Sequence, residues 1–201
     1  MLEHPTRLLL LVAFPLAVAA QEGAAPPEVG GDPTAHRHLG AFFRAELGSG
    51  HFTSALPGVT VSRWGTLAGL AAGGAFREDC LVGAQAWGAS VSSDGETTGL
   101  SGYGALFSWY YQPGNAYLAL TPSLTRRTFS AGDGIFQIST HSDWGLGLRA
   151  AGGREWWLSS HWGLGLGGWL AVSRNRAGAM AASGQSWNTA IVGVVGSATY
   201  N

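Results

Sequence analysis

The chain has 201 residues, of which 11% are charged and 46% are hydrophobic, and its formal net charge is −1. Ordinary soluble domains carry roughly 25% charged residues, so the composition argues against a water-facing exterior, while the apolar and aromatic content argues against a disordered chain. A nearly neutral chain also gives no reason to expect nucleic acid as a partner.

The first residues have the pattern of an export signal. Arg7 precedes the apolar run of residues 8–20, which is too short to cross a bilayer as a helix. Small residues before Gln21 fit a cleavage site, so we expect a signal peptide over residues 1–20. Residues 21–38 predict a flexible periplasmic lead-in, in which His36 and His38 are solvated tail residues rather than metal ligands.

No transmembrane helix is predicted after the signal. The longest later apolar stretch, residues 64–76, contains four glycines and falls short of the roughly 20 residues that a helical span needs. Within a bilayer every backbone polar group must be satisfied inside the protein. An exported chain with an apolar exterior therefore predicts a closed β-barrel.

Segments of strand length alternate with turn signals from Leu39 to the end of the chain. In residues 161–172, large apolar side chains occupy every second position except Gly168, and small residues occupy most of the positions between them. We therefore predict an all-β fold over residues 39–201, an eight-stranded antiparallel up-and-down transmembrane barrel. The predicted strands are residues 39–48, 62–76, 81–92, 99–112, 115–128, 142–158, 161–172 and 187–200.

The predicted connections alternate in length. Tight turns are expected around residues 77–80, 112–115 and 159–161, and longer polar links at residues 49–61, 93–98, 129–141 and 173–186. Outer-membrane barrels have short periplasmic turns and longer extracellular loops. Three short turns and four long loops fit eight strands with both termini on the periplasmic side.

Aromatic residues gather beside the predicted tight turns. Rings that are apolar with a polar tip favour the headgroup depth of a membrane, so these residues predict an aromatic girdle at one interface. Its predicted members are Trp109, Tyr110, Tyr111, Trp156, Trp157, Trp162 and Tyr200, with Phe76 close by. A second girdle is expected at the opposite interface, from Trp64, Phe129, Trp144 and Trp187.

Four segments carry a resemblance to a known family: LGAFFRAELGSG, SGYGALFSWYYQPGNAYLAL, GGREWWLSSHWGLGLGGWL and the ending VVGSATYN. Together they resemble the small outer-membrane β-barrel proteins of Gram-negative bacteria, and most of all the Gly/Ala-rich versions of myxobacteria. The resemblance covers residues 39–201 and implies an eight-stranded barrel without an established biochemical activity. The chain departs from many such barrels at its end, because Tyr200 is penultimate and Asn201 is last.

Four polar residues are expected to face the barrel lumen: Arg44, Glu46, Gln85 and Arg149. Buried charges must be paired, so a structural network is expected here. Such a network would plug the lumen, because an eight-stranded interior is normally filled by side chains. The alternative is a charged constriction that gates a narrow, porin-like channel.

The triplet His141-Ser142-Asp143 is the one local cluster that suggests nucleophilic catalysis. Adjacent strand residues point to opposite faces, so His141 and Ser142 are poorly placed to share a hydrogen bond. We therefore expect no catalytic site, metal or cofactor, and keep a lipid-modifying enzyme as a minor alternative to the channel. The expected protein is a monomeric structural or surface-interaction barrel in the outer membrane, whose partners are outer-membrane lipids and the barrel-insertion machinery.

Overall fold

The computed structural model describes residues 38, 40–93, 95–112, 114–132, 138–178 and 184–201. The predicted signal peptide and almost all of the predicted lead-in lie outside this part of the chain. Among the residues described, no helix is long and apolar enough to cross a membrane.

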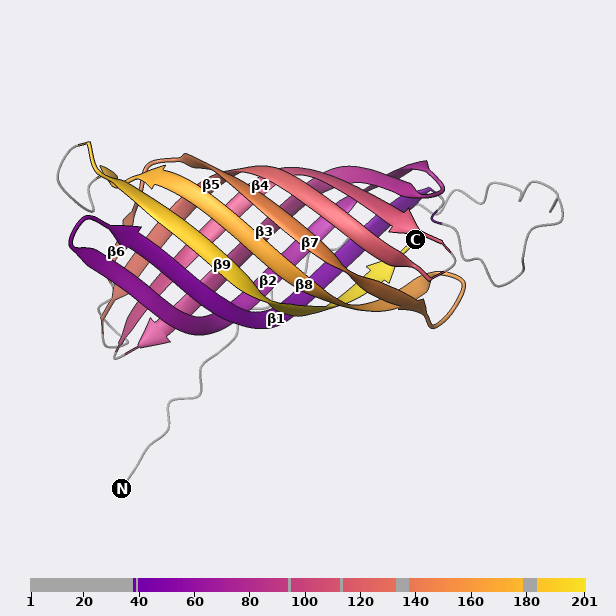
Figure 1. Cartoon of the computed structure of the whole chain (residues 1–201), viewed down its shortest axis with the longest axis horizontal. Helices are drawn as coiled ribbons and strands as arrows, with labels where there is room; N and C mark the ends of the chain where they lie inside the picture. The colour runs from indigo at the N-terminus through magenta and orange to yellow at the C-terminus, as the bar shows by residue number, and fades with distance from the viewer. Residues whose placement is uncertain (1–37, 39, 94, 113, 133–137, 179–183) are drawn as a thin grey trace, which may run out of the picture. The chain divides into compact units, whose positions relative to one another are not determined.

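The described chain is built from antiparallel strands that wind around a common axis (Figure 1). Their bounds are β1 Ala41–Leu56, β2 Val59–Arg77, β3 Cys80–Ser93, β4 Glu96–Tyr111, β5 Ala116–Ala131, β6 Ile138–His141, β7 Gly145–Trp157, β8 Trp162–Arg176 and β9 Ser186–Tyr200.

The strands form one closed ring. Each strand pairs with its neighbours in the order β4-β3-β2-β1-β9-β8-β7-β5, and a further pairing of β4 with β5 closes the circle. The short β6 and the longer β7 both pair with β5, so together they occupy one position in the ring. The fold is therefore the closed, eight-stranded antiparallel barrel that the alternation predicts.

Residues between β6 and β7 leave the regular ladder but stay attached to it. The amide of Ser142 donates to the carbonyl of Arg127, and the amide of Asp143 donates to the carbonyl of Arg176. The break is thus a local interruption of the sixth predicted strand and adds no further strand to the ring.

Side chains alternate between the lumen and the exterior as predicted. On β8, Leu164, Leu166 and Leu170 are exposed, whereas Gly165, Gly167 and Trp169 face inward. The interior leaves little space: a Cβ on Gly167 would lie 2.7 Å from the hydroxyl of Tyr117. Small inward residues on this strand are therefore required by the narrow lumen.

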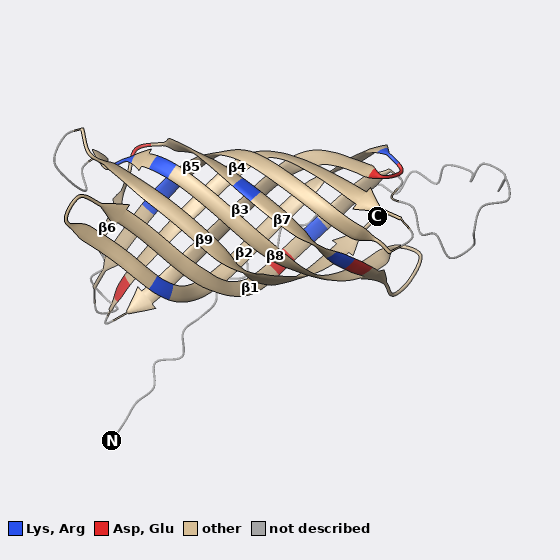
Figure 2. Cartoon of the chain, viewed as in Figure 1, with Lys and Arg blue, Asp and Glu red and all other residues tan. Residues whose placement is uncertain are grey.

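The exterior carries a broad apolar surface. Exposed leucines, valines and aromatic rings occur on nearly every strand, and few charged residues interrupt the ribbons (Figure 2). A monomeric soluble protein rarely exposes a contiguous apolar surface larger than a few hundred Å². The surface instead matches the apolar band of a membrane-spanning barrel.

The two ends of the barrel differ. The terminal end holds Asn201 and the three tight turns, which lie where they were predicted, at the junctions β2–β3, β4–β5 and β7–β8. The opposite end is called the mouth below. It holds the hairpins β1–β2 and β3–β4, the β5–β6 connection and the start of β9.

Two of the four predicted long links are wrong. β1 continues to Leu56 and β2 begins at Val59, and β3 and β4 are separated only by residues 94–95. Gly58 and Gly95 have φ values of +82° and +79°, which suits tight hairpin turns. The polar residues of 49–61 and 93–98 are typical of loops, but most of them lie on strands that continue beyond the apolar surface. The links at 129–141 and 173–186 are shortened too, and residues 133–137 and 179–183 lie outside the described chain.

Candidate functional site in the barrel lumen

The terminal-end layer is a group of polar side chains that crosses the lumen, formed by Arg44, Tyr110, Glu155 and Thr199. The Arg44 guanidinium lies 3.6 Å from Glu155 Oε2 and donates from Nε to Thr199 Oγ1 at 3.1 Å. Arg44 also donates to the Tyr110 hydroxyl, and the Thr199 hydroxyl donates to Glu155. Because these residues come from β1, β4, β7 and β9, the layer joins distant positions of the ring.

His38 fills the terminal end of the lumen and is fully buried. Its ring centroid lies 3.9 Å from that of Tyr110, and its Nδ1 is 3.1 Å from Asn201 Oδ1. Burial lowers the pKa of His38 below its ordinary 6.5, outweighing the hydrogen bond with Asn201 and the charge of Glu155, which raise it. The structure thus corrects the expectation of a solvated tail histidine, because His38 is part of the barrel interior.

The middle layer is formed by Glu46, Gln85, Thr121 and Arg149. Arg149 Nη2 lies 2.5 Å from Glu46 Oε2, and Arg149 Nη1 donates to Gln85 Oε1 at 2.8 Å. The Gln85 amide donates to Glu46 at 3.3 Å, and the Thr121 hydroxyl donates to Gln85 at 2.6 Å. Glu46, Gln85 and Arg149, three of the predicted lumen residues, therefore form one network, while Arg44 belongs to the neighbouring layer.

The tryptophan layer lies between the middle layer and the mouth. Trp87 on β3 and Trp169 on β8 come from opposite sides of the ring and meet edge to face, with centroids 5.9 Å apart. Trp87 Nε1 donates to Ser123 Oγ at 2.9 Å, and Arg149 Cζ lies 4.5 Å from the Trp169 ring centroid. Both indoles are buried. Large side chains therefore cross the lumen at this level.

A cavity of about 690 Å³ occupies the mouth, beyond the tryptophan layer. Its lining includes Arg127 and Trp187, and Arg127 Cζ lies 3.5 Å from the Trp187 ring centroid. Phe129 also lines this cavity, so Phe129 and Trp187 do not form the second outward girdle that was predicted. Trp64 and Trp144 are exposed on the outside.

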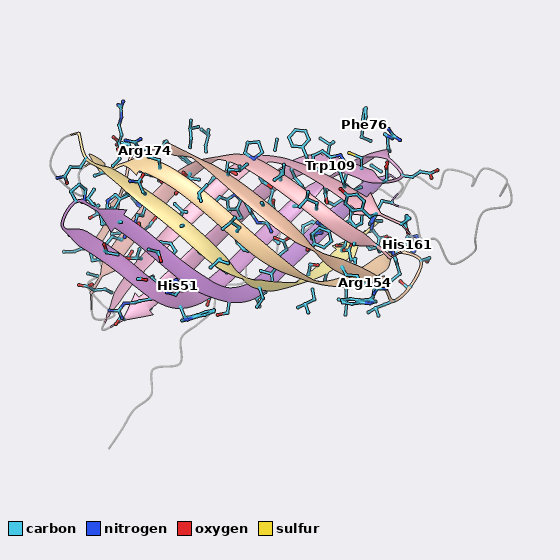
Figure 3. The ribbon with its side chains drawn as sticks, viewed as in Figure 1. His51, Phe76, Trp109, Arg154, His161 and Arg174 are labelled. Atoms are coloured by element: carbon cyan, nitrogen blue, oxygen red, sulfur yellow. The ribbon has the colours of Figure 1, made fainter. Side chains whose placement is uncertain are left out.

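The predicted aromatic girdle at the terminal end divides into two sets. The rings of Trp109, Tyr111, Trp156, Trp162 and Tyr200 are exposed. Phe76 and Trp109 project outward near this end, whereas His51 and Arg174 lie toward the mouth (Figure 3).

Two predicted girdle members face the lumen instead. Tyr110 is buried in the terminal-end layer, and Trp157 has its ring centroid 5.2 Å from that of His38. The correction follows from strand geometry, since consecutive residues point to opposite faces. Tyr110 cannot share a face with Trp109 and Tyr111, nor Trp157 with Trp156.

His141 and Ser142 make separate contacts. The buried Ser142 hydroxyl accepts from the Arg127 amide at 2.9 Å and donates to the Asp143 carbonyl at 2.8 Å. His141 Nδ1 lies 3.1 Å from the Thr128 hydroxyl. The serine hydroxyl is therefore engaged with backbone groups, and among the described residues it makes no hydrogen bond with the neighbouring histidine.

Sequence reasoning missed several lumen residues, among them His38, Tyr110, Arg127 and Glu155. The signal for Glu155 and Arg127 was available, because each lies an even number of positions from an inward residue on its own strand, Arg149 and Thr121 respectively. The signal for His38 was absent, since it precedes the first strand and carries no alternation.

No family model matches the chain, and no match was found among curated proteins. Among solved structures, the chain is similar to Neisserial surface protein A, with 15% identity and a TM-score of 0.56 over 78% of this chain and 95% of that one. It also matches Ail of Yersinia pestis, with 10% identity and a TM-score of 0.44 over 79% of this chain and 99% of that one. A third match is OprG of Pseudomonas aeruginosa, with 13% identity and a TM-score of 0.43 over 85% and 100% of the two chains. The likeness to Neisserial surface protein A shows that the chain has the fold of a small outer-membrane β-barrel.

Proposed function

We propose that this protein is a monomeric outer-membrane barrel with a closed lumen, which acts in the envelope through structure and surface interaction. The observation that carries the proposal is the stack of three side-chain layers across the lumen. Its largest members are Trp87 and Trp169, and these two rings, Arg44 and Arg149 are each no more than 3% exposed. A barrel closed by such layers presents only its outside and its mouth to other molecules.

The apolar exterior supports placement in a membrane, with lipids as the direct partners. Exposed aromatic rings near the terminal end, such as Trp109 and Trp162, fit the headgroup depth of one interface. We place this end in the periplasm, because outer-membrane barrels have their short turns there. Insertion by the cellular barrel-insertion machinery follows from this placement, with Tyr200 on the outer face of the last strand. Export by a signal peptide over residues 1–20 is part of the same proposal.

A narrow channel is the second candidate, favoured by the charges within the lumen. Against it stands the pairing of those charges: Arg149 with Glu46 and Arg44 with Glu155. An ion crossing this level would have to displace buried, hydrogen-bonded groups, which carries a cost of several kcal/mol.

Planar-bilayer recording distinguishes the two candidates. The purified protein should give no discrete openings, while a porin inserted under the same conditions should conduct. Recording should be repeated with the double variant Trp87→Ala/Trp169→Ala, which removes the tryptophan layer but keeps both ion pairs. Regular openings in the wild type would overturn the closed barrel and establish the channel.

We also propose that the protein is not an enzyme. The support is the arrangement around Ser142, whose hydroxyl is bonded to backbone groups rather than to His141. Lipid extracted from cells that carry Ser142→Ala should have the same composition as lipid from wild-type cells. A changed acyl-chain profile would support the lipid-modifying alternative instead.

A further inference from the structure

The mouth cavity is lined by apolar side chains and by three charged residues, Arg63, Glu96 and Arg127. Its volume of about 690 Å³ lies within the range of small-molecule sites in proteins. Leu56, Val61, Val91 and Trp187 supply apolar lining from β1, β2, β3 and β9. These four strands are consecutive neighbours in the ring, so a hydrocarbon chain could lie against one continuous side of the lumen.

Arg127 lies at the inner part of this lining and is only 2% exposed. Its Nε has no hydrogen-bond partner, and no acidic side chain among the described residues lies within 4.0 Å of it. The guanidinium instead packs against the Trp187 ring, with Cζ 3.5 Å from the centroid. Stacking leaves the edge of the guanidinium available, and that edge is the part that binds an oxyanion.

The other buried arginines show what is missing at this position. Arg44 lies beside Glu155, and Arg149 lies beside Glu46. Among the described residues, the lumen thus holds three buried arginines and two buried glutamates, and Arg127 is the arginine without a carboxylate. A buried cation without a partner is strongly unfavourable. The exposed Glu96 also lines the cavity, but it makes no ion pair with Arg127, so the guanidinium is left for a negative group from outside the chain.

We propose that the mouth cavity binds an amphipathic carboxylate, an acid that bears a hydrocarbon tail. The carboxylate pairs with the guanidinium of Arg127, and the tail lies against the apolar wall formed by Leu56, Val61, Val91 and Trp187. The inference deepens the proposed function, on which it rests, by naming the class of molecule that the outward mouth takes from its surroundings.

Octanoate is a suitable probe because it has one carboxylate and a tail of modest length. Equilibrium dialysis should measure labelled octanoate bound to the full chain in lipid nanodiscs, with empty nanodiscs subtracting partition into the lipid. We expect saturable binding to the wild type, and at least tenfold weaker binding of octanol and of octylammonium, because both lack the anionic group. Binding of all three at equal strength would overturn the proposal.

The chain offers a matched control for the arginine. Arg127→Met should weaken octanoate binding by at least tenfold. Arg126→Met changes the neighbouring arginine, which stacks outside the barrel on Trp144 with 5.7 Å between Cζ and ring centroid, and should leave binding unchanged. Equal loss in both variants, or no loss in Arg127→Met, would refute the assignment.

A second variant covers the case in which Arg127→Met does not fold. Val61→Trp adds an indole to the cavity wall and keeps the arginine, and it should weaken octanoate binding while its band on gels remains heat-modifiable. Undiminished binding in Val61→Trp would overturn the proposed position of the tail. Conductance is recorded separately, so channel openings would refute the closed lumen without affecting the dialysis result.

Discussion

Replacing Arg149 by methionine keeps much of the side-chain volume and removes the charge that pairs with Glu46. In the wild type the two groups lie 2.5 Å apart, and each side chain is 1% exposed. After the change, Glu46 Oε2 would keep only the Gln85 amide at 3.3 Å, and Glu46 Oε1 already has no hydrogen-bond partner. The variant therefore leaves an uncompensated carboxylate inside the barrel.

The expected cost is about 3–5 kcal/mol of unfolding free energy, the range measured when one partner of a buried pair is removed. The double variant Arg149→Met/Glu46→Leu removes both charges and should recover about 2 kcal/mol or more of that loss. As a control, Arg77→Met breaks an ion pair with Asp79 whose side chains are 71% and 53% exposed. That exposed pair should contribute less than about 1 kcal/mol.

Urea unfolding in phospholipid vesicles, followed by tryptophan fluorescence, measures all four proteins under one condition. Coincident folding and unfolding curves establish that the free energies are equilibrium values. If Arg149→Met costs no more than Arg77→Met, or if the double variant is no more stable than Arg149→Met, the buried pair does not stabilise the barrel as we infer.

Three further changes test other parts of the structure. Leu166→Arg, on the apolar exterior, should cost about 2–4 kcal/mol in vesicles if the position lies near the bilayer midplane; urea unfolding with no loss would contradict the membrane placement. Because the pKa of His38 lies below 6.5 in the folded state, the unfolded chain binds more protons than the folded chain as pH falls below 6.5. The free energy of unfolding should therefore fall with pH, and His38→Gln should reduce this pH dependence between pH 7.5 and 5. A Cβ on Gly102 would lie 2.6 Å from Nε1 of Trp87, so Gly102→Ala should lower the free energy of unfolding by about 1–3 kcal/mol. Gly99→Ala should lower it by less, because its Cβ would meet no atom nearer than 3.5 Å. Equal midpoints for these two glycine variants would show that the tryptophan layer is not tightly packed.

Strand alternation is a local property, and it predicted the parts of the lumen that depend on it alone. Arg44, Glu46 and Arg149 were assigned to the inner face because their neighbours are apolar or small at every second position. The same rule, applied consistently, would have turned Tyr110 and Trp157 inward as well. Both lie in runs of aromatic residues, and a run of adjacent rings on a strand divides between its two faces.

The pairing of charges depends on where distant strands lie around the ring, and the sequence alone did not reveal it. Arg149 and Glu46 are separated by 103 positions in the chain, and alternation alone allows Glu46 to pair with either Arg44 or Arg149. The ends of the strands at the mouth were equally hidden, because residues 49–56 are polar on their outer face and were taken for a loop. Residues of this kind still pair with the neighbouring strands, β2 and β9, where the strands extend beyond the apolar surface.

The terminal-end layer also bears on how the chain is completed during assembly. Arg44 in the first strand is joined to Thr199, 155 positions later, and His38 to Asn201, 163 positions later. β1 and β8 both have β9 as their neighbour, so a chain without its last strand would present two unpaired edges to lipid. The terminal-end layer therefore finds all its partners only when β9 is in place, so this layer forms together with the closure of the ring.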